Sequence, residues 1–272
     1  MRFSQAWARV GEFQASMMFE LSGVSVTAGP RTLLHGIDLS LDGTGLVGLI
    51  GHNGSGKSTL LRVLARQLAP STGHVRFGGR RLQDWGMREF ARQLAYLPQE
   101  PPATTGMTVR DLVGLGRYAW HGALGRFGTD DRVAVEAAME RTGMARFAGR
   151  AVAELSGGER QCCWIAMSLA QEARCLLLDE PTAALDLAHQ RVVLDVLRSL
   201  NREHGIGIVI VLHDINLAAR YCDELVALRT GRLIARGAAA DIMTTERLRE
   251  IYAVDLGLLP HPSGGAPIAY LP

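Results

Sequence analysis

The stretch that decides the fold is Gly51-His52-Asn53-Gly54-Ser55-Gly56-Lys57-Ser58-Thr59, a glycine-rich run that ends in a lysine and two hydroxyl residues. It matches G-x-x-x-x-G-K-[ST], the phosphate-binding loop. The apolar run 46–50 before it predicts a buried strand. The run 57–68 after it has apolar residues at helical spacing and predicts a helix. Strand, glycine loop and helix together form the context that the motif requires.

The residue types in this loop suit the binding of phosphate. Glycines allow backbone N–H groups to turn inward around phosphate oxygens, and the helix N-terminus adds partial positive charge. We expect Lys57 to reach the β- and γ-phosphates of a nucleotide and Ser58 to place its hydroxyl on Mg²⁺. The alternative is a glycine-rich turn that matches by chance, and the two flanking elements argue against it.

Length and composition limit the possible classes of protein. The chain has 272 residues, 47% of them hydrophobic, and a formal net charge of +2, so no nucleic-acid partner is indicated. Its longest apolar runs are well short of the roughly 18 residues of a membrane-spanning helix. The four cysteines form no C-x-x-C pair and are expected to be reduced thiols in the cytoplasm: Cys162, Cys163, Cys175 and Cys222.

The rest of the chain alternates short apolar strands with helices on either side of a helical stretch. Strands are predicted over 19–26, 33–41, 74–77, 94–97, 175–178 and 206–212, and a hairpin over 225–228 and 233–235. Helices are predicted over 109–116, over 130–142 with Thr129 as N-cap, and over 159–171 and 187–202. The interruption of the alternation over about 100–172 predicts an inserted helical subdomain. Residues 1–18 are expected to be a loose extension, 19–272 a single domain, and the tail over about 255–272 mostly irregular.

Asp179 and Glu180 follow directly after the predicted buried strand 175–178. Ligands of open parallel sheets bind at the carboxyl ends of the strands. Beside a phosphate loop, Asp179 is expected to order Mg²⁺ and Glu180 to accept a proton from water that attacks the γ-phosphate. The alternative is a pair of solvent-exposed carboxylates at a strand end, which is ordinary in isolation but less fitting next to the loop.

A further motif, Leu155-Ser156-Gly157-Gly158-Glu159-Arg160-Gln161, opens a predicted helix with two glycines. By itself it is also compatible with a simple N-cap followed by flexible glycines. Three other features accompany it: Gln99 after a strand, Ala184-Leu185-Asp186 shortly after Asp179, and His213 at a strand end. Together with the phosphate loop, these motifs make the chain resemble the ABC transporter ATPases from about residue 19 to the tail.

This resemblance implies a fold and a mechanism. The fold would be α/β: a P-loop NTPase core of the RecA-like type, with a small antiparallel β-subdomain and the inserted helical subdomain. ATP and Mg²⁺ would be the cofactors, and two subunits would clamp two ATP molecules head to tail. Ser156, Gly157 and Gly158 of one subunit would touch the γ-phosphate held by Lys57 of the other. Gln99 would contact Mg²⁺ and the attacking water, His213 the γ-phosphate, and Asp186 would lie at the dimer seam.

The chain departs from the family pattern at two places. Many relatives have an aromatic residue after the first strand that stacks on adenine, whereas Ala28 occupies that position here. Arg31 is the alternative contact that we expect for the base. Cys162-Cys163 stand where relatives often have a basic residue, and we expect these thiols only to pack.

A finer resemblance concerns the substrate. The segments 116–128, 212–223 and 258–262 are similar to the ATPase subunits of ferric hydroxamate (ferrichrome-type) siderophore importers. This implies a membrane permease and a periplasmic binding protein as partners, a peripheral place on the cytoplasmic face of the inner membrane, and Tyr118, Trp120 and Phe127 as apolar contacts to the permease. Importers of other iron chelates, haem or cobalamin remain alternatives. A soluble ABC ATPase without transport fits less well, because the chain has one phosphate loop and no heptad array, and a module that binds without turnover fits poorly with Glu180 and His213.

Overall fold

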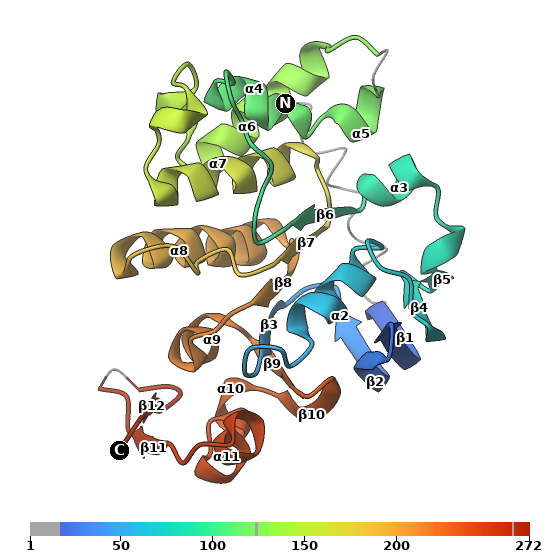
Figure 1. Ribbon diagram of the computed structural model, residues 1–272. Helices are drawn as coiled ribbons and strands as arrows, with labels where there is room; N and C mark the ends of the chain where they lie inside the picture. The colour runs from blue at the N-terminus through green and yellow to red at the C-terminus, as the bar shows by residue number, and fades with distance from the viewer. Residues whose placement is uncertain (1–16, 123–124, 263) are drawn as a thin grey trace.

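The computed structural model describes residues 17–122, 125–262 and 264–272. At its centre lies a six-stranded sheet in the order β10-β9-β3-β8-β7-β6, parallel except for the β9–β10 hairpin (Figure 1). Helices cover both faces, so the inner strands are apolar along their whole length, as parallel sheets require. The strands of this sheet are β3 (Leu46–Ile50), β6 (Leu94–Leu97), β7 (Cys175–Leu178), β8 (Gly207–Val211), β9 (Glu224–Arg229) and β10 (Arg232–Gly237).

Successive residues of these strands enter two different hydrophobic cores. In β8, for example, Ile208 and Ile210 pack into the core toward the helical region, whereas Val209 and Val211 pack into the core beneath the second sheet. This alternation follows from the two-residue period of a strand. Each core buries one face of the central sheet, so the parallel strands connect the helical region on one side with the second sheet on the other.

The second sheet is antiparallel, in the order β2-β1-β4-β5, and lies on the side of the central sheet where α2 packs (Figure 1). Phe19 and Phe77 face each other across β1 and β4 with ring centroids 4.9 Å apart. The first strand starts two residues before the expected boundary at 19, and Met18 is buried within it. Residues 1–16 lie outside the described part of the chain. The elements are β1 (Met17–Ala28), β2 (Arg31–Asp42), β4 (Thr72–Phe77), β5 (Arg80–Arg81) and α2 (Lys57–Leu64).

The helical region packs against the edge of the central sheet formed by β6 and β7 (Figure 1). Its α7 contacts α4, α6 and α8, so α7 is the central helix of this region. Helix α6 begins at Thr129, and Gly128 is its N-cap instead of the expected Thr129, because the backbone N–H of Gly128 donates to Asp131 Oδ2 at 2.8 Å. The helices from β4 to the end of this region are η2 (Leu82–Asp84), α3 (Met87–Ala91), α4 (Val109–Leu115), α5 (Tyr118–His121), α6 (Thr129–Arg141), η3 (Ala145–Phe147), η4 (Val152–Glu154) and α7 (Gly157–Ala170), followed by α8 (Leu187–His204).

The tail is more regular than its composition indicates. The expectation of a mostly irregular segment over 255–272 holds for most of its described residues, but β11 (Gly257–Leu259) and β12 (Ile268–Tyr270) form an antiparallel hairpin that was not expected. The Asn216 side chain fixes this hairpin by donating to Ala269 O at 3.0 Å and accepting from Ala269 N at 2.8 Å. This contact spans 53 residues, so local composition does not reveal it. The remaining elements are α9 (Ile215–Tyr221), α10 (Ala239–Ile242) and α11 (Thr245–Tyr252).

Candidate nucleotide site

The phosphate loop lies between β3 and α2, and its glycines have backbone conformations that other residues rarely adopt. Gly51 has φ +134°, and a Cβ there would overlap the carbonyl oxygen of Leu228. Gly56, the N-cap of α2, has φ +106°, and a Cβ there would lie 2.8 Å from Leu34 Cδ2. Ser55 is fully buried, and its Oγ has no partner within the described structure. The loop therefore has the shape that the motif requires, fixed by contacts to neighbouring strands.

Lys57 is buried, and its ammonium group is held by the loop itself. Nζ donates to Gly51 O at 2.8 Å and to His52 O at 3.1 Å. Burial lowers the pKa of Lys57, while the nearby carboxylates of Glu180 and Asp179 act in the opposite direction. A buried ammonium with only carbonyl partners is well prepared to bind an anion, because a phosphate oxygen would offset its lost hydration.

Ser58, which lines the cavity, forms a pair with Asp179. Ser58 Oγ donates to Asp179 Oδ1 at 2.9 Å, whereas Asp179 Oδ2 is buried without a partner in the described structure. Burial raises the pKa of Asp179, and the nearby Glu180 adds to this effect, although the bond from Ser58 opposes it. A hydroxyl beside a carboxylate with an unused oxygen is the kind of donor set that suits Mg²⁺, which prefers oxygen ligands.

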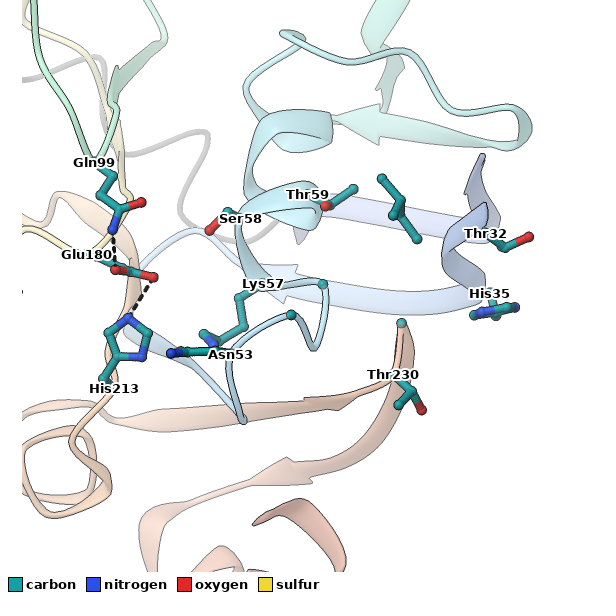
Figure 2. Close-up of a pocket in the computed structure, with 14 residues that line it drawn as sticks. Thr32, His35, Asn53, Lys57, Ser58, Thr59, Gln99, Glu180, His213 and Thr230 are labelled. Carbon is teal, nitrogen blue, oxygen red and sulfur yellow. Dashed lines mark hydrogen bonds and ion pairs between the residues drawn. The ribbon is translucent and has the colours of Figure 1, made fainter. Parts of the chain in front are cut away.

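Three side chains from adjacent parallel strands meet at the carboxyl edge of the sheet. Gln99 follows β6, Glu180 follows β7 and His213 follows β8. Gln99 Nε2 donates to Glu180 Oε2 at 2.6 Å, and His213 Nε2 lies 2.6 Å from Glu180 Oε1 (Figure 2). Glu180 also has φ +52°, a left-handed backbone conformation that costs free energy for a non-glycine residue. The fold thus holds this carboxylate in one position from both sides.

A cavity of about 590 Å³ joins these groups. It is bounded at one end by Gln99, Glu180 and His213 and at the other by residues of β2 and of the β9–β10 turn (Figure 2). Of the residues predicted from the sequence, the lining contains Asn53, Gly54, Gly56, Lys57, Ser58, Thr59, Gln99, Glu180 and His213. It also contains residues that the sequence motifs do not indicate: Thr32, Leu33, His35, Thr230 and Gly231. The sequence indicates this second set only through the predicted hairpin over 225–228 and 233–235, whose connection contains Thr230 and Gly231.

Ser156, Gly157, Gly158 and Asp186 do not line this cavity in the described structure. Ser156 caps α7: its Oγ accepts from Glu159 N at 3.3 Å, and its own N–H donates to Glu159 Oε2 at 2.9 Å. Asp186 caps α8, because its Oδ1 accepts from the His189 backbone N at 2.9 Å. A Cβ on Gly158 would overlap the His189 ring, so α7 and α8 approach closely at this point. The two caps therefore form a second polar region, separate from the cavity.

Two comparisons with known proteins agree with these motifs. A family model described as ABC transporter matches residues 34–183. The iron(3+)-hydroxamate import ATP-binding protein FhuC of Bacillus subtilis is 40% identical over 240 residues, which cover 88% of this chain and 89% of that protein. The chain belongs to the ABC transporter ATP-binding proteins.

Other relatives of this ABC ATPase differ in the compound that they are named for. The achromobactin transport ATP-binding protein CbrD of Dickeya dadantii is 44% identical, with 88% of each chain covered. The hemin import ATP-binding protein HmuV of Streptomyces coelicolor is 43% identical, with 90% of this chain and 86% of that protein covered. The comparisons therefore show the family. Relatives of similar identity to this chain, however, are named for different compounds.

Solved structures confirm the α/β fold with its P-loop core. MJ1267, an ATP-binding cassette of an ABC transporter in its ADP conformation, matches with a TM-score of 0.79 at 21% identity, over 88% of this chain and 99% of that one. The dimeric structure of MJ0796, a bacterial ABC transporter cassette, matches with a TM-score of 0.70 at 27% identity, over 82% of this chain and 99% of that one.

The family and its curated relatives also show the activity: the ABC ATPase binds ATP and couples its hydrolysis to transport. None of the helices that the structure describes is long and apolar enough to cross a membrane.

The cysteines of this ABC ATPase are placed for packing. Cys162 and Cys163 lie on α7 and are buried in the core of the helical region. Burial raises the pKa of Cys162 to about 11 and that of Cys163 to about 12. Both thiols are therefore protonated at neutral pH, which makes them poor nucleophiles and poor metal ligands.

Proposed function

We propose that this ABC ATPase drives an importer of iron chelates and that ferric hydroxamate siderophores are its substrate. The observation that carries the hydrolytic part is Glu180, held between Gln99 and His213 beside Lys57. In this position Glu180 acts as the general base that accepts a proton from the attacking water. Gln99 and His213 keep the carboxylate pointed into the cavity, and Lys57 binds the β- and γ-phosphates.

Mg²⁺ fits the pair formed by Ser58 and Asp179. The buried, unpartnered Oδ2 of Asp179 is the supporting observation, because a buried carboxylate oxygen without a partner is costly unless a ligand completes it. Ser58 and Asp179 would hold the ion, and Gln99 would contact it. Mg²⁺ bound there with ATP would supply positive charge that stabilises the phosphoryl group during transfer.

The catalytic unit is proposed to be a head-to-tail homodimer. The motif at Ser156, Gly157 and Gly158 lies at the start of α7 and outside the cavity lining of its own chain, so it is available to the cavity of a second chain. Next to Asp186, Leu187 is 80% exposed, although it is a large apolar residue. An interface between two chains at this motif would bury the Leu187 side chain.

A permease is proposed to dock in a groove of about 680 Å³ between the sheet edge and α7. The groove is lined by Gln99, Pro101, Trp164 and Leu185, among others, and it shares Gln99 and Glu180 with the nucleotide cavity. A helix of the permease placed there would touch the same two side chains that hold the attacking water. This arrangement provides a direct physical link between docking and hydrolysis and gives the protein its peripheral place at the inner membrane.

Tyr118, Trp120 and Phe127 are not among the described residues that line this groove. The guanidinium groups of Arg92 and Arg117 instead lie over the Trp120 ring, at 4.8 and 5.0 Å from its centroid, and Trp120 Nε1 donates to Gln171 O at 2.8 Å. The Trp120 ring is therefore engaged in contacts within the chain, whereas Tyr118 and Phe127 are exposed outside the groove; Ala123 and Leu124 of the segment 116–128 lie outside the described residues. The similarity of this segment to siderophore importers therefore supports the proposed substrate only as a family resemblance, and not through a contact in the proposed permease groove.

The substrate is tested by deletion of the gene in the source organism. Growth on ferrichrome-type siderophores as sole iron source should be lost, while growth on haem or on abundant free iron persists; complementation with the wild-type gene should restore it. A periplasmic binding protein and the permease would select the chelate, so the ATPase determines which importer is powered. Loss of growth on haem or of cobalamin use, with hydroxamate growth intact, would contradict the substrate and leave the hydrolytic mechanism standing.

A further inference from the structure

The nucleotide cavity has an end that the phosphate chemistry does not use. In the proposed function, Lys57 and Ser58 lie where the phosphates bind, and Glu180 lies on the side from which water attacks. The opposite end is lined by Thr32, Leu33, His35, Thr230 and Gly231 (Figure 2). A nucleoside triphosphate is elongated, so with its terminal phosphate toward Glu180 its base must lie toward this opposite end.

Two rings line the cavity among the residues that the structure describes, His35 and His213. His213 is bonded to Glu180 at the hydrolytic end. His35 lies at the opposite end, where Leu33 of the same strand also lines the cavity. Neither Ala28 nor Arg31, the two positions that the sequence suggested for contact with the base, is part of the described lining.

The surroundings of His35 are fixed by close backbone contacts. His35 N donates to Gly231 O at 2.8 Å, and Gly231 N in turn donates to Ser55 O of the phosphate loop at 2.9 Å. Gly231 has φ +75°, and a Cβ there would lie 2.9 Å from His35 Cδ2. The β9–β10 turn therefore packs directly against the imidazole of His35. Through its two backbone bonds, the turn also connects β2 to the phosphate loop and fixes the position of this strand relative to the loop.

We propose that the His35 imidazole, together with Leu33, provides the surface on which this ABC ATPase holds the base of ATP, in place of an aromatic residue of β1. A flat ring provides a stacking face that any purine can use, while Leu33 adds apolar contact. The inference rests on the nucleotide site of the proposed function and is independent of the imported substrate.

The test compares the affinity of the purified protein for ATP and for inorganic tripolyphosphate, both with Mg²⁺, by calorimetry. His35→Ala should weaken ATP binding about fivefold to tenfold and change tripolyphosphate binding by less than about twofold, because tripolyphosphate has no base. His35→Phe should restore ATP affinity, since it returns a flat ring. His74→Ala, on β4 and outside the cavity lining, is the matched control and should leave both affinities unchanged.

Three outcomes would overturn the inference: unchanged ATP affinity in His35→Ala, an equal loss for ATP and tripolyphosphate, or no recovery in His35→Phe. If His35→Ala fails to fold, His35→Gln serves the same purpose, because it keeps polarity and size but removes the ring. Failure of the wild-type protein to bind ATP would instead refute the proposed nucleotide site itself.

Discussion

Buried polar groups are left without partners around the phosphate loop, whereas most of those in the helical region are paired. Of the four buried side-chain polar atoms without a partner in the described structure, Ser55 Oγ and Asp179 Oδ2 lie at the loop, and Glu180 beside them has a left-handed backbone. In the helical region, the buried Arg117 donates to Asp131 Oδ1, Ala170 O and Glu172 Oε2. His121 Nε2 is the exception there.

This difference separates a region built to receive a ligand from a region that is complete by itself. Unsatisfied donors and acceptors lower the stability of the free protein but become favourable once a ligand binds them. Substitutions around the loop should therefore reduce activity without loss of stability. Substitutions in the paired network of the helical region should do the reverse.

The largest effect is expected at the proposed general base, Glu180. Glu180→Gln should bind ATP but hydrolyse it about 10²–10⁴-fold more slowly, because an amide cannot accept the proton while Lys57, Ser58 and Asp179 remain. Phosphate release under single-turnover conditions measures the rate, and with Mg-ATP the variant should accumulate as a dimer on size exclusion. Turnover close to that of the wild type would remove Glu180 from the mechanism.

A smaller effect, on stability, is expected in the helical region. Trp120→Ala removes contacts to two guanidinium groups and the bond to Gln171 O, so the free energy of unfolding should fall by about 2 kcal/mol. Urea unfolding measures it. Tyr118→Ala is the matched control on the same helix, where the side chain is mostly exposed, and should cost less than about 0.5 kcal/mol. An equal fall in the free energy of unfolding in both variants would contradict the packing role of Trp120.

The smallest effect is a gain in stability at Asp179. Burial raises the pKa of this carboxyl, so the fold favours its protonated form. The free energy of unfolding therefore includes a contribution from this group at low pH, and that contribution is lost as the pH rises through the raised pKa. Asp179→Asn should therefore stabilise the nucleotide-free protein by about 1 kcal/mol at neutral pH, while it weakens Mg²⁺-dependent ATP binding. Thermal unfolding at neutral and at mildly acidic pH gives the comparison. A stability difference that does not shrink toward acidic pH would show that the buried charge is not its cause.

The sequence predicted the phosphate-loop side of the molecule well because its signals are local. The loop, its strand and helix, and the polar residues after β6, β7 and β8 are each recognisable within a few residues. The helix after the loop is shorter than predicted, since α2 ends at Leu64 and Arg66 adopts a positive φ of 59°. The polar residues fall at one edge because parallel strands align their carboxyl ends.

The features that the sequence did not predict depend on contacts between distant segments. His35 faces the cavity only because β2 pairs with the β9–β10 turn, nearly 200 residues away in sequence. The tail hairpin likewise depends on Asn216, which is 53 residues from its partner Ala269. Trp120 looks like a surface anchor in the sequence, but Arg92, one of the two arginines at its ring, is 28 residues away in the chain. Such pairings are set by the tertiary fold and leave no local pattern.

The central claim is that each chain carries complete phosphate chemistry but needs the Ser156 motif of a second chain. It is tested most directly by mixing two variants that are inactive alone. Lys57→Ala destroys the phosphate site of its own chain, and Ser156→Arg places a bulky side chain where the phosphate of the other chain belongs. A mixed head-to-tail dimer would contain one intact site, so an equal mixture should recover about a quarter of wild-type hydrolysis.

In the same experiment, Ser156→Arg alone should still bind ATP, because Lys57 of its own chain is unchanged. Recovery of hydrolysis on mixing, measured as phosphate release against protein concentration, is the result that the account predicts. Full activity of Ser156→Arg by itself, or of a strictly monomeric wild-type protein, would contradict it.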